Sequence, residues 1–508
     1  MFIDTADLTS DTIVADLAVF GAGPSGISLA RALAARRMNV ALFESGGFHV
    51  DPERQGLFDG VSIGEHMLPE QGRYRVFGGA GTRWTGRCAK LDPIDFERRP
   101  WIPHSGWPFE YEELLAYYPE AASLCGFPPN WEAVPGWFAD LSRQRPDPGG
   151  AIMPFIWHFF KTGRARYRDF GRDNFEELRT NPNLYVFTNV DIVDVTPHHH
   201  QITSACLRDR AGRQLRVKAG GYVLACGGIE NTRLLMNFAR NHRPAFGQIQ
   251  DSIGRRFMQH PRTVTARIEA NPRQAIALQQ RFNNFGQVGQ HFESGFALSP
   301  EAQRRHGLVN ASAVLRYSSS FWNLCQDMMR RPVQTLDALR LRATGRVGPL
   351  SCDNILLHVD LEQVPDPESR LLLSEKRDAL GLNRIVVDWR ISPVERETSA
   401  FFTRSIGEWL SKAGLGKPVY AQGLDETGAL VSDRLQESYH HIGGTRMSET
   451  PRTGVVDRNL KVHGLSNLYL AGSSVMPTGG HANPTLTILC LTLRLAQHIN
   501  AAILAGIL

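Results

Sequence analysis

Residues 16–44 decide the fold, and they read DLAVFGAGPSGISLARALAARRMNVALFE. Asp16–Phe20 is a short apolar run typical of a buried strand, and Ile27–Arg36 has the apolar spacing of a helix. A second apolar run, Asn39–Phe43, predicts another strand. The order strand, glycine turn, helix, strand is typical of a dinucleotide-binding βαβ unit, whose two strands belong to one parallel sheet.

The turn carries the G-x-G-x-x-G spacing that dinucleotide binding requires. Gly21 allows the tight turn, and Gly23 has no Cβ to block a pyrophosphate. Gly26 lets the helix pack closely on the strand, and the helix N-terminus offers free N–H groups to phosphates. Glu44, roughly 20 residues beyond Gly26, is placed to accept hydrogen bonds from a ribose diol. Because one such fingerprint occurs, the sequence predicts one dinucleotide, which the fingerprint alone leaves as FAD or NAD.

The composition is that of a globular protein of several structural units. The chain has 508 residues, of which 42% are hydrophobic and 21% are charged, and this excludes a disordered chain and a collagen. A net charge of +5 is too small for this length to indicate a nucleic-acid partner. Seven widely spaced cysteines without a C-x-x-C pair argue against a disulfide framework, a zinc site and an iron–sulfur cluster. No metal site is expected.

Neither end of the sequence predicts targeting to a membrane or to the exterior. Residues 1–16 are acidic and lack the basic and apolar regions of a secretory signal. Leu486–Leu508 is apolar but contains Arg494 and His498, so we expect a core helix rather than a membrane span. We therefore expect a cytoplasmic protein.

Two more stretches predict backbone that lies close to a ligand. Arg73–Lys90 reads RYRVFGGAGTRWTGRCAK, and its glycines allow the backbone to approach a flat ligand or a phosphate. Short strands predicted between residues 184 and 225 lead into a second glycine turn, ACGGIEN at 225–231, and then into an apolar helix. This turn suits another nucleotide-facing edge of the same sheet.

From about residue 263 to residue 431 the pattern changes to alternating apolar and polar residues, which predicts an antiparallel sheet. The alternating segments are Thr263–Ile268, Asn310–Tyr317, Asn354–Leu361, Arg370–Leu373 and Ile385–Trp389. Ser399–Ala413 has the pattern of an amphipathic helix that covers one face of this sheet. Residues 92–180, rich in Pro, Trp and Phe, predict irregular covering structure with short helices.

The C-terminal part holds the polar residues of greatest interest. Residues 439–447 read YHHIGGTRM, and residues 467–472, NLYLAG, predict a strand that ends in glycine. Asn483-Pro484-Thr485 opens the final predicted helix, because Pro is favoured at the first helical position and Asn is a good N-cap. The helix start also directs its positive end at whatever lies before it. Asn483 therefore serves either as a plain cap or as part of a site.

These motifs, in this order, resemble those of the glucose–methanol–choline (GMC) oxidoreductases, a family of FAD-dependent alcohol oxidases and dehydrogenases. The resemblance runs from the GAGPSG turn to the C-terminal helix. It includes SIGRRFMQHP at 252–261, EQVPDPESRLLLSEKRDALG at 362–381 and GVVDRNLKVHGLSNLYLAGSSVMPTGGHANPTLT at 454–487. The sugar- and glycoside-oxidising branch, with pyranose oxidase-like members, is the most similar, because there the second polar partner is Asn rather than His.

The resemblance implies an α/β fold, α+β overall. A Rossmann-like FAD-binding domain is joined to a substrate domain whose antiparallel sheet is covered by helices. The segments expected are 12–91, 181–262 and 432–508 for the FAD-binding domain, 92–180 for a covering insertion, and 263–431 for the substrate domain.

The resemblance also implies the catalytic residues. In the family a His stands three residues before the glycine of an H-x-x-G-T motif, and an Asn or His follows about forty residues later. His440, three residues before Gly443, and Asn483 match these positions. His441 is the competing base, because Gly444 follows it at the same spacing, although the register of the flanking residues favours His440. Neighbouring side chains of an extended segment point to opposite faces, so only one of the two histidines should face the flavin.

The chemistry that the resemblance implies is oxidation of an alcohol. A neutral imidazole, with an ordinary pKa of about 6.5, takes the hydroxyl proton while hydride passes to flavin N5. The Asn483 amide holds the same oxygen and orients the C–H bond. His481 is a weaker candidate, expected to line the pocket or to pack.

Some family members bind flavin covalently through a His in the loop that matches GGAGTRWT. Arg83 stands at that position here, so we expect non-covalent FAD. Besides the fingerprint residues Gly21, Gly23, Gly26 and Glu44, the expected FAD contacts are Gly79, Thr82, Arg83, Thr85, Val190, Ala225, Gly472, Asn483 and Thr485.

The leading functional prediction is FAD-dependent oxidation of a sugar, glycoside, aminosugar or cyclitol alcohol to the carbonyl. The alternatives are a lyase of this fold with a structural flavin, a dehydrogenase of a non-sugar primary alcohol, and a non-catalytic FAD-binding scaffold. The expected partners are a small polyol or glycoside and an electron acceptor, which is oxygen, a quinone or another redox partner. Because cysteine spacings for an iron–sulfur cluster or haem are absent, any electron relay must lie on another chain.

Overall fold

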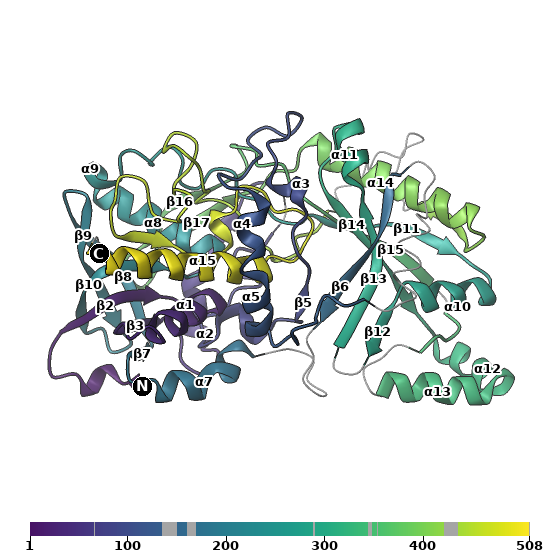
Figure 1. Ribbon diagram of the computed structural model, residues 1–508, viewed down its shortest axis with the longest axis horizontal. Helices are drawn as coiled ribbons and strands as arrows, with labels where there is room; N and C mark the ends of the chain where they lie inside the picture. The colour runs from purple at the N-terminus through teal and green to yellow at the C-terminus, as the bar shows by residue number, and fades with distance from the viewer. Residues whose placement is uncertain are drawn as a thin grey trace.

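The computed structural model describes residues 1–65, 67–134, 150–159, 169–287, 290–343, 348–352, 354–420 and 435–506. Parts of the predicted segments 92–180 and 263–431 therefore lie outside the described residues. Two large sheets stand side by side, and helices pack around each of them (Figure 1). The mixed α/β fold, with a Rossmann-like parallel sheet and an antiparallel sheet, confirms the predicted fold class.

The first sheet is the predicted nucleotide sheet, and it has eight strands. Their order is β1-β7-β3-β2-β10-β9-β8, and β19 pairs with β10 on a branch. The strands are β1 (Phe2–Ile3), β2 (Thr12–Phe20), β3 (Val40–Glu44), β7 (Leu184–Thr188), β8 (Val190–His198), β9 (Gln201–Asp209), β10 (Gln214–Leu224) and β19 (Leu468–Leu470). Six of its strands run parallel, namely β1, β7, β3, β2, β10 and β19. The other two, β8 and β9, pair antiparallel beside β10.

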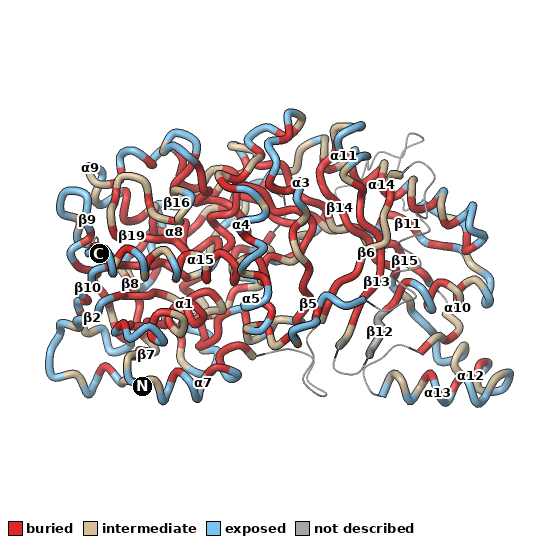
Figure 2. Tube along the Cα trace, in the orientation of Figure 1, coloured by how far each residue is buried: buried red, intermediate tan, exposed pale blue. Residues whose placement is uncertain are grey.

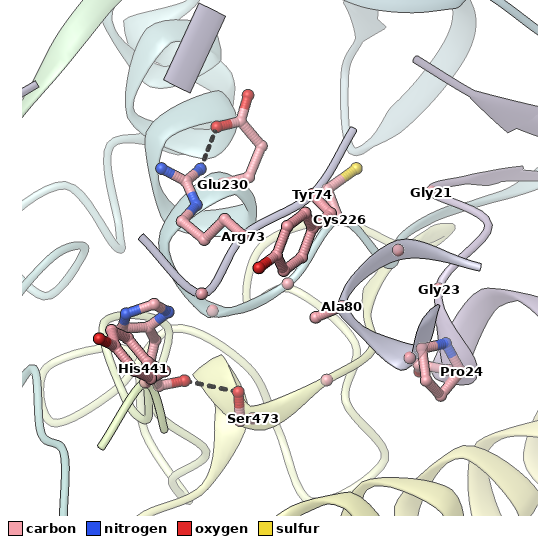
Figure 3. Close-up of a pocket in the computed structure, with 18 of the residues that line it drawn as sticks. Gly21, Gly23, Pro24, Arg73, Tyr74, Ala80, Cys226, Glu230, His441 and Ser473 are labelled. Carbon is pink, nitrogen blue, oxygen red and sulfur yellow. Dashed lines mark hydrogen bonds and ion pairs between the residues drawn. The ribbon is translucent and has the colours of Figure 1, made fainter. Parts of the chain in front are cut away.

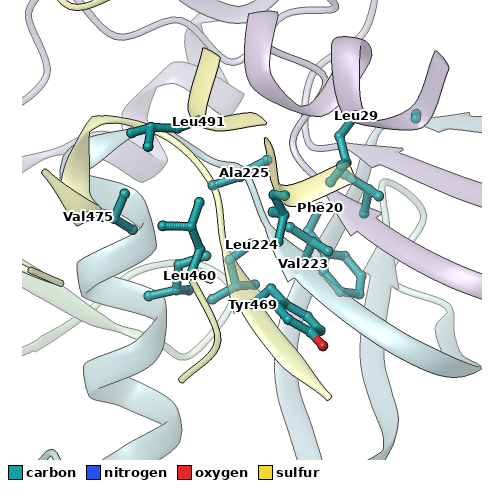
Figure 4. Close-up of a cluster of buried hydrophobic side chains, with 14 of the residues drawn as sticks. Phe20, Leu29, Val223, Leu224, Ala225, Leu460, Tyr469, Val475 and Leu491 are labelled. Atoms are coloured by element: carbon teal, nitrogen blue, oxygen red, sulfur yellow. The ribbon is translucent and has the colours of Figure 1, made fainter. Parts of the chain in front are cut away.

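A large apolar core forms where the N-terminal and C-terminal parts of the chain meet. Phe20, Val223 and Leu224 come from β2 and β10, and Tyr469 from β19, and all four are buried side by side (Figure 4). The burial explains why these strands read as continuous apolar runs rather than alternating ones. The helices of this half are α1 (Pro24–Ala34), α7 (Phe170–Thr180), α8 (Gly228–Asn241), α9 (Arg243–Phe246) and α15 (Thr485–Leu504).

The final helix, α15, is long and apolar enough to cross a membrane by length and composition. It contacts α1 and α5 (Tyr118–Leu124), and Leu486, Leu489 and Leu493 on it are buried. Red buried segments run along much of its length in Figure 2. The predicted core helix therefore agrees with its place in the fold.

The second sheet is antiparallel and also has eight strands. Their order is β18-β11-β15-β14-β13-β6-β5, and β12 pairs with β13. The strands are β5 (Arg87–Cys88), β6 (Ile152–Phe159), β11 (Arg262–Glu269), β12 (Asn284–Gln287), β13 (Gln290–Leu298), β14 (Ala311–Ser318), β15 (Asn354–Leu361) and β18 (Lys417–Tyr420). It takes β5 and β6 from before residue 180, so the sheet is built from more than the 263–431 stretch whose alternation predicted it.

Alternation along these strands separates an apolar face from a polar one. On β15, Leu357 and Val359 point into a core with Phe402 and Ile406 of α14 (Pro393–Lys412). The opposite face carries the charged residues and is turned toward the nucleotide sheet. The remaining helices of this half are α10 (Pro272–Arg281), α11 (Pro300–His306), α12 (Phe321–Arg330) and α13 (Pro332–Ala343).

Two strands predicted for the antiparallel sheet belong elsewhere. The prediction that Arg370–Leu373 and Ile385–Trp389 join it is wrong, because they form β16 (Arg370–Arg377) and β17 (Asn383–Asp388) of a separate three-stranded sheet. The third strand is β4 (Gly60–Ser62), which pairs parallel with β17. Three short helices lie toward the junction of the two halves, namely α3 (Pro93–Phe96), α4 (Tyr111–Leu115) and α5, whereas α2 (Pro52–Gln55) lies beside the nucleotide sheet (Figure 1).

Candidate active site

A cavity of about 870 Å³ lies between the two large sheets. One end is formed by the glycine turn after β2 and by Glu44 at the end of β3. The other end is formed by His440, Asn483 and one face of the antiparallel sheet. Residues from the two ends of the sequence thus border one continuous space, at the carboxyl ends of parallel strands where α/β folds bind ligands.

The glycine turn has the geometry that the spacing predicts. Gly21 has φ +102°, and a Cβ built on it would lie 2.5 Å from the carbonyl oxygen of Ala225. A Cβ on Gly26 would lie 1.8 Å from the carbonyl oxygen of Gly21, so the helix and the turn pack too closely for any side chain. A Cβ on Gly23 would meet no atom within 4 Å, and Gly23 lines the cavity. The space beside Gly23 is therefore left for a ligand.

Glu44 borders the same end of the cavity and is buried. Its two oxygens each accept a backbone hydrogen bond of 2.8 Å, from Ala22 and from Gly46. Burial raises the pKa of Glu44 to about 7 despite these two bonds. The carboxylate is fixed on the backbone of the glycine turn, and each oxygen keeps a second lone pair for a ribose hydroxyl.

Most of the other predicted cofactor contacts border the cavity too. They are Gly79, Arg83, Thr85, Val190, Ala225, Gly472, Asn483 and Thr485. Thr82 and Gly26 do not line it. Thr82 Oγ1 donates to the carbonyl oxygen of Gly79 at 2.9 Å and so closes its own turn, while Gly26 faces the backbone of Gly21.

The donor set and the shape fit FAD. A dinucleotide needs a close backbone approach at the pyrophosphate, which Gly23 leaves free, and helix N-termini with unpaired N–H groups. The N-termini of α1 and α15 both open on the cavity, through Pro24 and Thr485. The volume also suits a large ligand.

His440 is held between two polar side chains. Its Nδ1 lies 2.9 Å from Nδ1 of His260, and its Nε2 lies 3.1 Å from Nδ2 of Asn483. Nε2 of His260 in turn lies 3.4 Å from the carbonyl oxygen of Gly479. The three side chains come from distant parts of the sequence, since His260 precedes β11, His440 lies between β18 and β19, and Asn483 precedes α15.

These partners assign the protons of both rings. The Gly479 carbonyl can only accept, so His260 carries its proton on Nε2 and, when neutral, accepts at Nδ1. His440 must then donate from Nδ1 and leave Nε2 unprotonated. An unprotonated Nε2 is the acceptor that the Asn483 NH₂ group requires. The chain of bonds therefore exposes a basic nitrogen of His440 next to the amide of Asn483.

The surroundings keep both imidazoles neutral. Burial lowers the pKa of His440 well below its ordinary value, and the nearby His260 and Arg262 lower it further. Burial also lowers the pKa of His260 to about 4. Neutral rings are the forms that the hydrogen-bond assignment needs.

His441, the competing candidate, lines the cavity but faces other groups. Its ring is stacked near Phe257, with centroids 6.2 Å apart, and burial lowers its pKa to about 3. Its carbonyl oxygen accepts a hydrogen bond of 2.5 Å from Oγ of Ser473 (Figure 3). Both histidines border the cavity, but Asn483 bonds to His440 and not to His441, and this contact distinguishes the two candidates.

The start of the final helix differs slightly from the prediction. Pro484 is the N-cap rather than the first helical residue, and no side chain caps the helix. The interpretation of Asn483 as a plain N-cap is therefore wrong, because its side-chain amide forms a hydrogen bond with His440 and none with the helix N-terminus. His481 packs away from the cavity, where its Nε2 pairs with Asp92 at 3.1 Å.

Sequence reasoning missed several residues that build the site. His260 lies in the quoted motif SIGRRFMQHP, yet nothing in a single sequence links it to a residue 180 positions away. A buried ion-pair network on the wall of the cavity was also missed. In it Arg73 and Arg75 pair with Glu230 at 2.7 Å and 2.9 Å, and Arg75 pairs with Asp191 at 3.1 Å (Figure 3 shows Arg73 and Glu230). The network ties the loop of residues 73–75 to helix α8.

Comparison with known proteins agrees with this geometry. The GMC oxidoreductase family profile matches residues 365–492. The fructose dehydrogenase large subunit of Gluconobacter japonicus is 23% identical over 97% of this chain and 99% of its own length. Paromamine 6'-oxidase of Streptomyces fradiae is 24% identical over 98% of this chain and 93% of its own.

Among solved structures, pyridoxine 4-oxidase from Mesorbium loti superimposes with a TM-score of 0.60. The two sequences are 16% identical, and the superposition covers 96% of this chain and 99% of the pyridoxine 4-oxidase chain, so it supports the fold. Taken with the matched motifs and the cavity, these similarities agree with an FAD-dependent oxidoreductase of the GMC type, which acts on CH–OH groups.

Proposed function

We propose that the protein oxidises a hydroxyl group of a sugar, glycoside, aminosugar or cyclitol to the carbonyl, with His440 as the base. The observation that carries this proposal is the pair formed by His440 Nε2 and the Asn483 amide, 3.1 Å apart on the wall of the cavity. A substrate hydroxyl group can donate its proton to Nε2 of His440 and at the same time accept a hydrogen bond from the Asn483 amide. The names of the relatives, a fructose dehydrogenase and a paromamine oxidase, support a polyol as substrate.

In this mechanism the substrate hydroxyl displaces the direct bond between His440 and Asn483. Asn483 donates to the hydroxyl oxygen, and the hydroxyl proton faces Nε2 of His440. As the C–H bond breaks, Nε2 takes that proton, and general-base help of this kind contributes about 10²–10⁴-fold in rate. By accepting from Nδ1 of His440, His260 keeps Nε2 unprotonated before this transfer and keeps its bond to Nδ1 afterwards. Bound FAD supplies the acceptor for the hydride.

We propose that FAD is held without a covalent bond. Arg83 lines the cavity in the loop that matches the family's attachment loop, and a guanidinium group does not form a flavin linkage. Precipitating the protein with acid should therefore release all of the yellow colour into the supernatant.

The decisive experiment is anaerobic mixing of the FAD-loaded protein with a panel of sugars, glycosides, aminosugars and cyclitols. We expect the flavin absorbance to bleach with at least one of them, and peroxide formation in air then distinguishes an oxidase from a dehydrogenase. His440→Ala should lower the bleaching rate by at least 10²-fold. His441→Ala is the matched control and should keep most of the rate.

Two outcomes would contradict the proposal. A flavin that stays oxidised with every alcohol while a substrate is cleaved would indicate a lyase with a structural flavin. Equal loss of rate in the His440→Ala and His441→Ala variants would remove His440 from the role of base.

A further inference from the structure

Three arginines border the cavity on the side of the antiparallel sheet. Arg87 lies on β5, Arg262 on β11 and Arg316 on β14, and all three line the cavity. We call them the arginine wall. They lie close enough to the base for Arg262 and Arg87 to contribute to the lowered pKa of His440. The arginine wall is therefore near the place where the substrate hydroxyl would be held.

The carboxylates that pair with the arginine wall are Glu293 and Asp360, and neither lines the cavity. Their side chains are only 2% and 14% exposed, whereas those of Arg262 and Arg316 are 38% and 45% exposed. The carboxylates thus lie behind the guanidinium groups and fix them from the buried side. Among the residues that the structure describes, these three guanidinium groups and two carboxylates leave one positive charge in surplus.

The ion pairs leave donors of the arginine wall unused. Arg262 binds Asp360 through Nε and, at 3.1 Å, through Nη2, and Arg316 binds Glu293 through Nη1. Arg87 lies between them, with Nε 3.0 Å from Glu293 and Nη1 3.5 Å from Asp360. Its Nη2 is buried without a hydrogen-bond partner among the described residues. Nη1 of Arg262 and both Nε and Nη2 of Arg316 are not used in these pairs.

We propose that the arginine wall is a subsite for an anionic group, so that the alcohol which this enzyme oxidises carries a carboxylate or a phosphate. The proposal rests on the proposed function and narrows its substrate class to acidic sugars. A guanidinium group that is already oriented presents its N–H groups to an anion in a fixed fork, which matches carboxylate and phosphate oxygens. The same surplus charge disfavours an amino sugar, whose ammonium group is positive near neutral pH.

The test uses three sugars with the same ring and different charge. D-glucuronate, D-glucose and D-glucosamine are titrated into the FAD-loaded protein without oxygen, and binding is followed by the shift of the visible flavin spectrum. We expect D-glucuronate to bind at least tenfold more tightly than D-glucose, and D-glucosamine to bind most weakly. D-glucose 6-phosphate is a fourth probe, and tighter binding of this sugar than of D-glucuronate would assign the anion as a phosphate.

The variants show whether the arginine wall causes the preference. Arg262→Gln and Arg316→Gln should each reduce the preference for the anionic sugar about tenfold, measured as the ratio of the two dissociation constants for D-glucose and D-glucuronate. Arg316→Lys keeps the charge and should keep most of the preference. Arg267→Gln is the matched control, because Arg267 is also on β11 but pairs with Glu269 at the surface and does not line the cavity. Thermal melting of each variant confirms that it is folded.

The proposal is overturned if neither anionic sugar binds more tightly than D-glucose, or if the arginine variants weaken all four sugars equally. Its failure is separable from failure of the proposed function. Bleaching by a neutral sugar without any charge preference removes the subsite and keeps the oxidation. Tight binding of an anionic sugar without bleaching by any alcohol keeps the subsite and removes the oxidation.

Discussion

The protonation of single imidazoles sets the pH range in which the site can work. Because burial lowers the pKa of His440 well below about 6.5, the ring loses its proton at a lower pH than an exposed His. Nε2 therefore stays free as the solution is acidified from pH 8 through about 6.5. We expect the anaerobic rate of flavin reduction to remain constant over this range and to fall only at lower pH. An acid limb centred near 6.5 would contradict this assignment.

His260 acts through His440, as a positioning residue. Its unprotonated Nδ1 accepts from His440 at 2.9 Å, so His260→Phe removes that acceptor and leaves a buried N–H unpaired. We expect flavin reduction to slow about 10–100-fold, the usual effect of losing a group that orients a functional His.

His260→Asn offers an oxygen near the position of Nδ1 and should restore part of the rate. A merely structural role of His260 would lower the melting temperature in both variants without moving the acid limb of the pH profile. We expect the Phe variant to move that limb.

At this scale the sequence predicts only part of the site. His440 and Asn483 follow from the family resemblance, and the structure places them in contact. His260 and the arginine wall are not predictable from one sequence, because their roles arise from long-range contacts between strands. Thr82 is a residue that the sequence predicts as a cofactor contact and the structure does not place on the cavity. Its hydroxyl group donates instead to the carbonyl oxygen of Gly79 in its own loop.

Among the elements, the β2–α1–β3 unit depends on two glycines in different ways. A Cβ on Gly26 would meet the Gly21 carbonyl at 1.8 Å, whereas a Cβ on Gly23 would meet only the cavity. Gly26→Ala should therefore lower both the melting temperature of the apoprotein and the FAD content after purification. Gly23→Ala should lower the FAD content alone. Equal melting losses in the two variants would contradict this division of roles.

Some of the secondary-structure elements can be predicted directly from local sequence patterns. The βαβ unit is local, and its predicted strands and helix agree with β2, α1 and β3 to within a few residues at most boundaries. The pairing of β6 with β13, in contrast, joins strands that are far apart in the sequence, because β7 to β10 of the nucleotide sheet lie between them. Alternation identifies such strands but cannot say which sheet they join, and this is why β16 and β17 were placed in the wrong one.

For the whole molecule, the buried pair Arg99–Glu362 links the covering segments to the antiparallel sheet. The two bonds measure 2.7 Å and 2.6 Å, and both side chains are fully buried. Arg99→Met leaves an uncompensated carboxylate, which costs about 3–5 kcal/mol, and should lower the melting temperature markedly. The double variant Arg99→Met, Glu362→Met should recover much of the loss.

The pH dependence of this loss has a definite sign. Burial alone raises the pKa of Glu362, but the charge of Arg99 and several hydrogen bonds outweigh it and hold the pKa below its ordinary value. Without Arg99 the pKa should rise, so the carboxyl becomes neutral at mildly acidic pH. We expect the melting difference between Arg99→Met and the unaltered protein to shrink from pH 8 to pH 5, and a constant difference would contradict this account.

The meeting of β2 and β19 in one sheet has a consequence for biosynthesis. The phosphate-binding turn leaves the ribosome before Asn483 and the helix behind it, because β2 and α1 precede β19 and α15 in the chain by more than 400 residues. A nascent chain that lacks β19 and α15 exposes the apolar surface that they later cover. Loading with the yellow cofactor should therefore be a late event, and a stalled or prematurely terminated product should be a substrate for chaperones and proteases rather than a partly active enzyme.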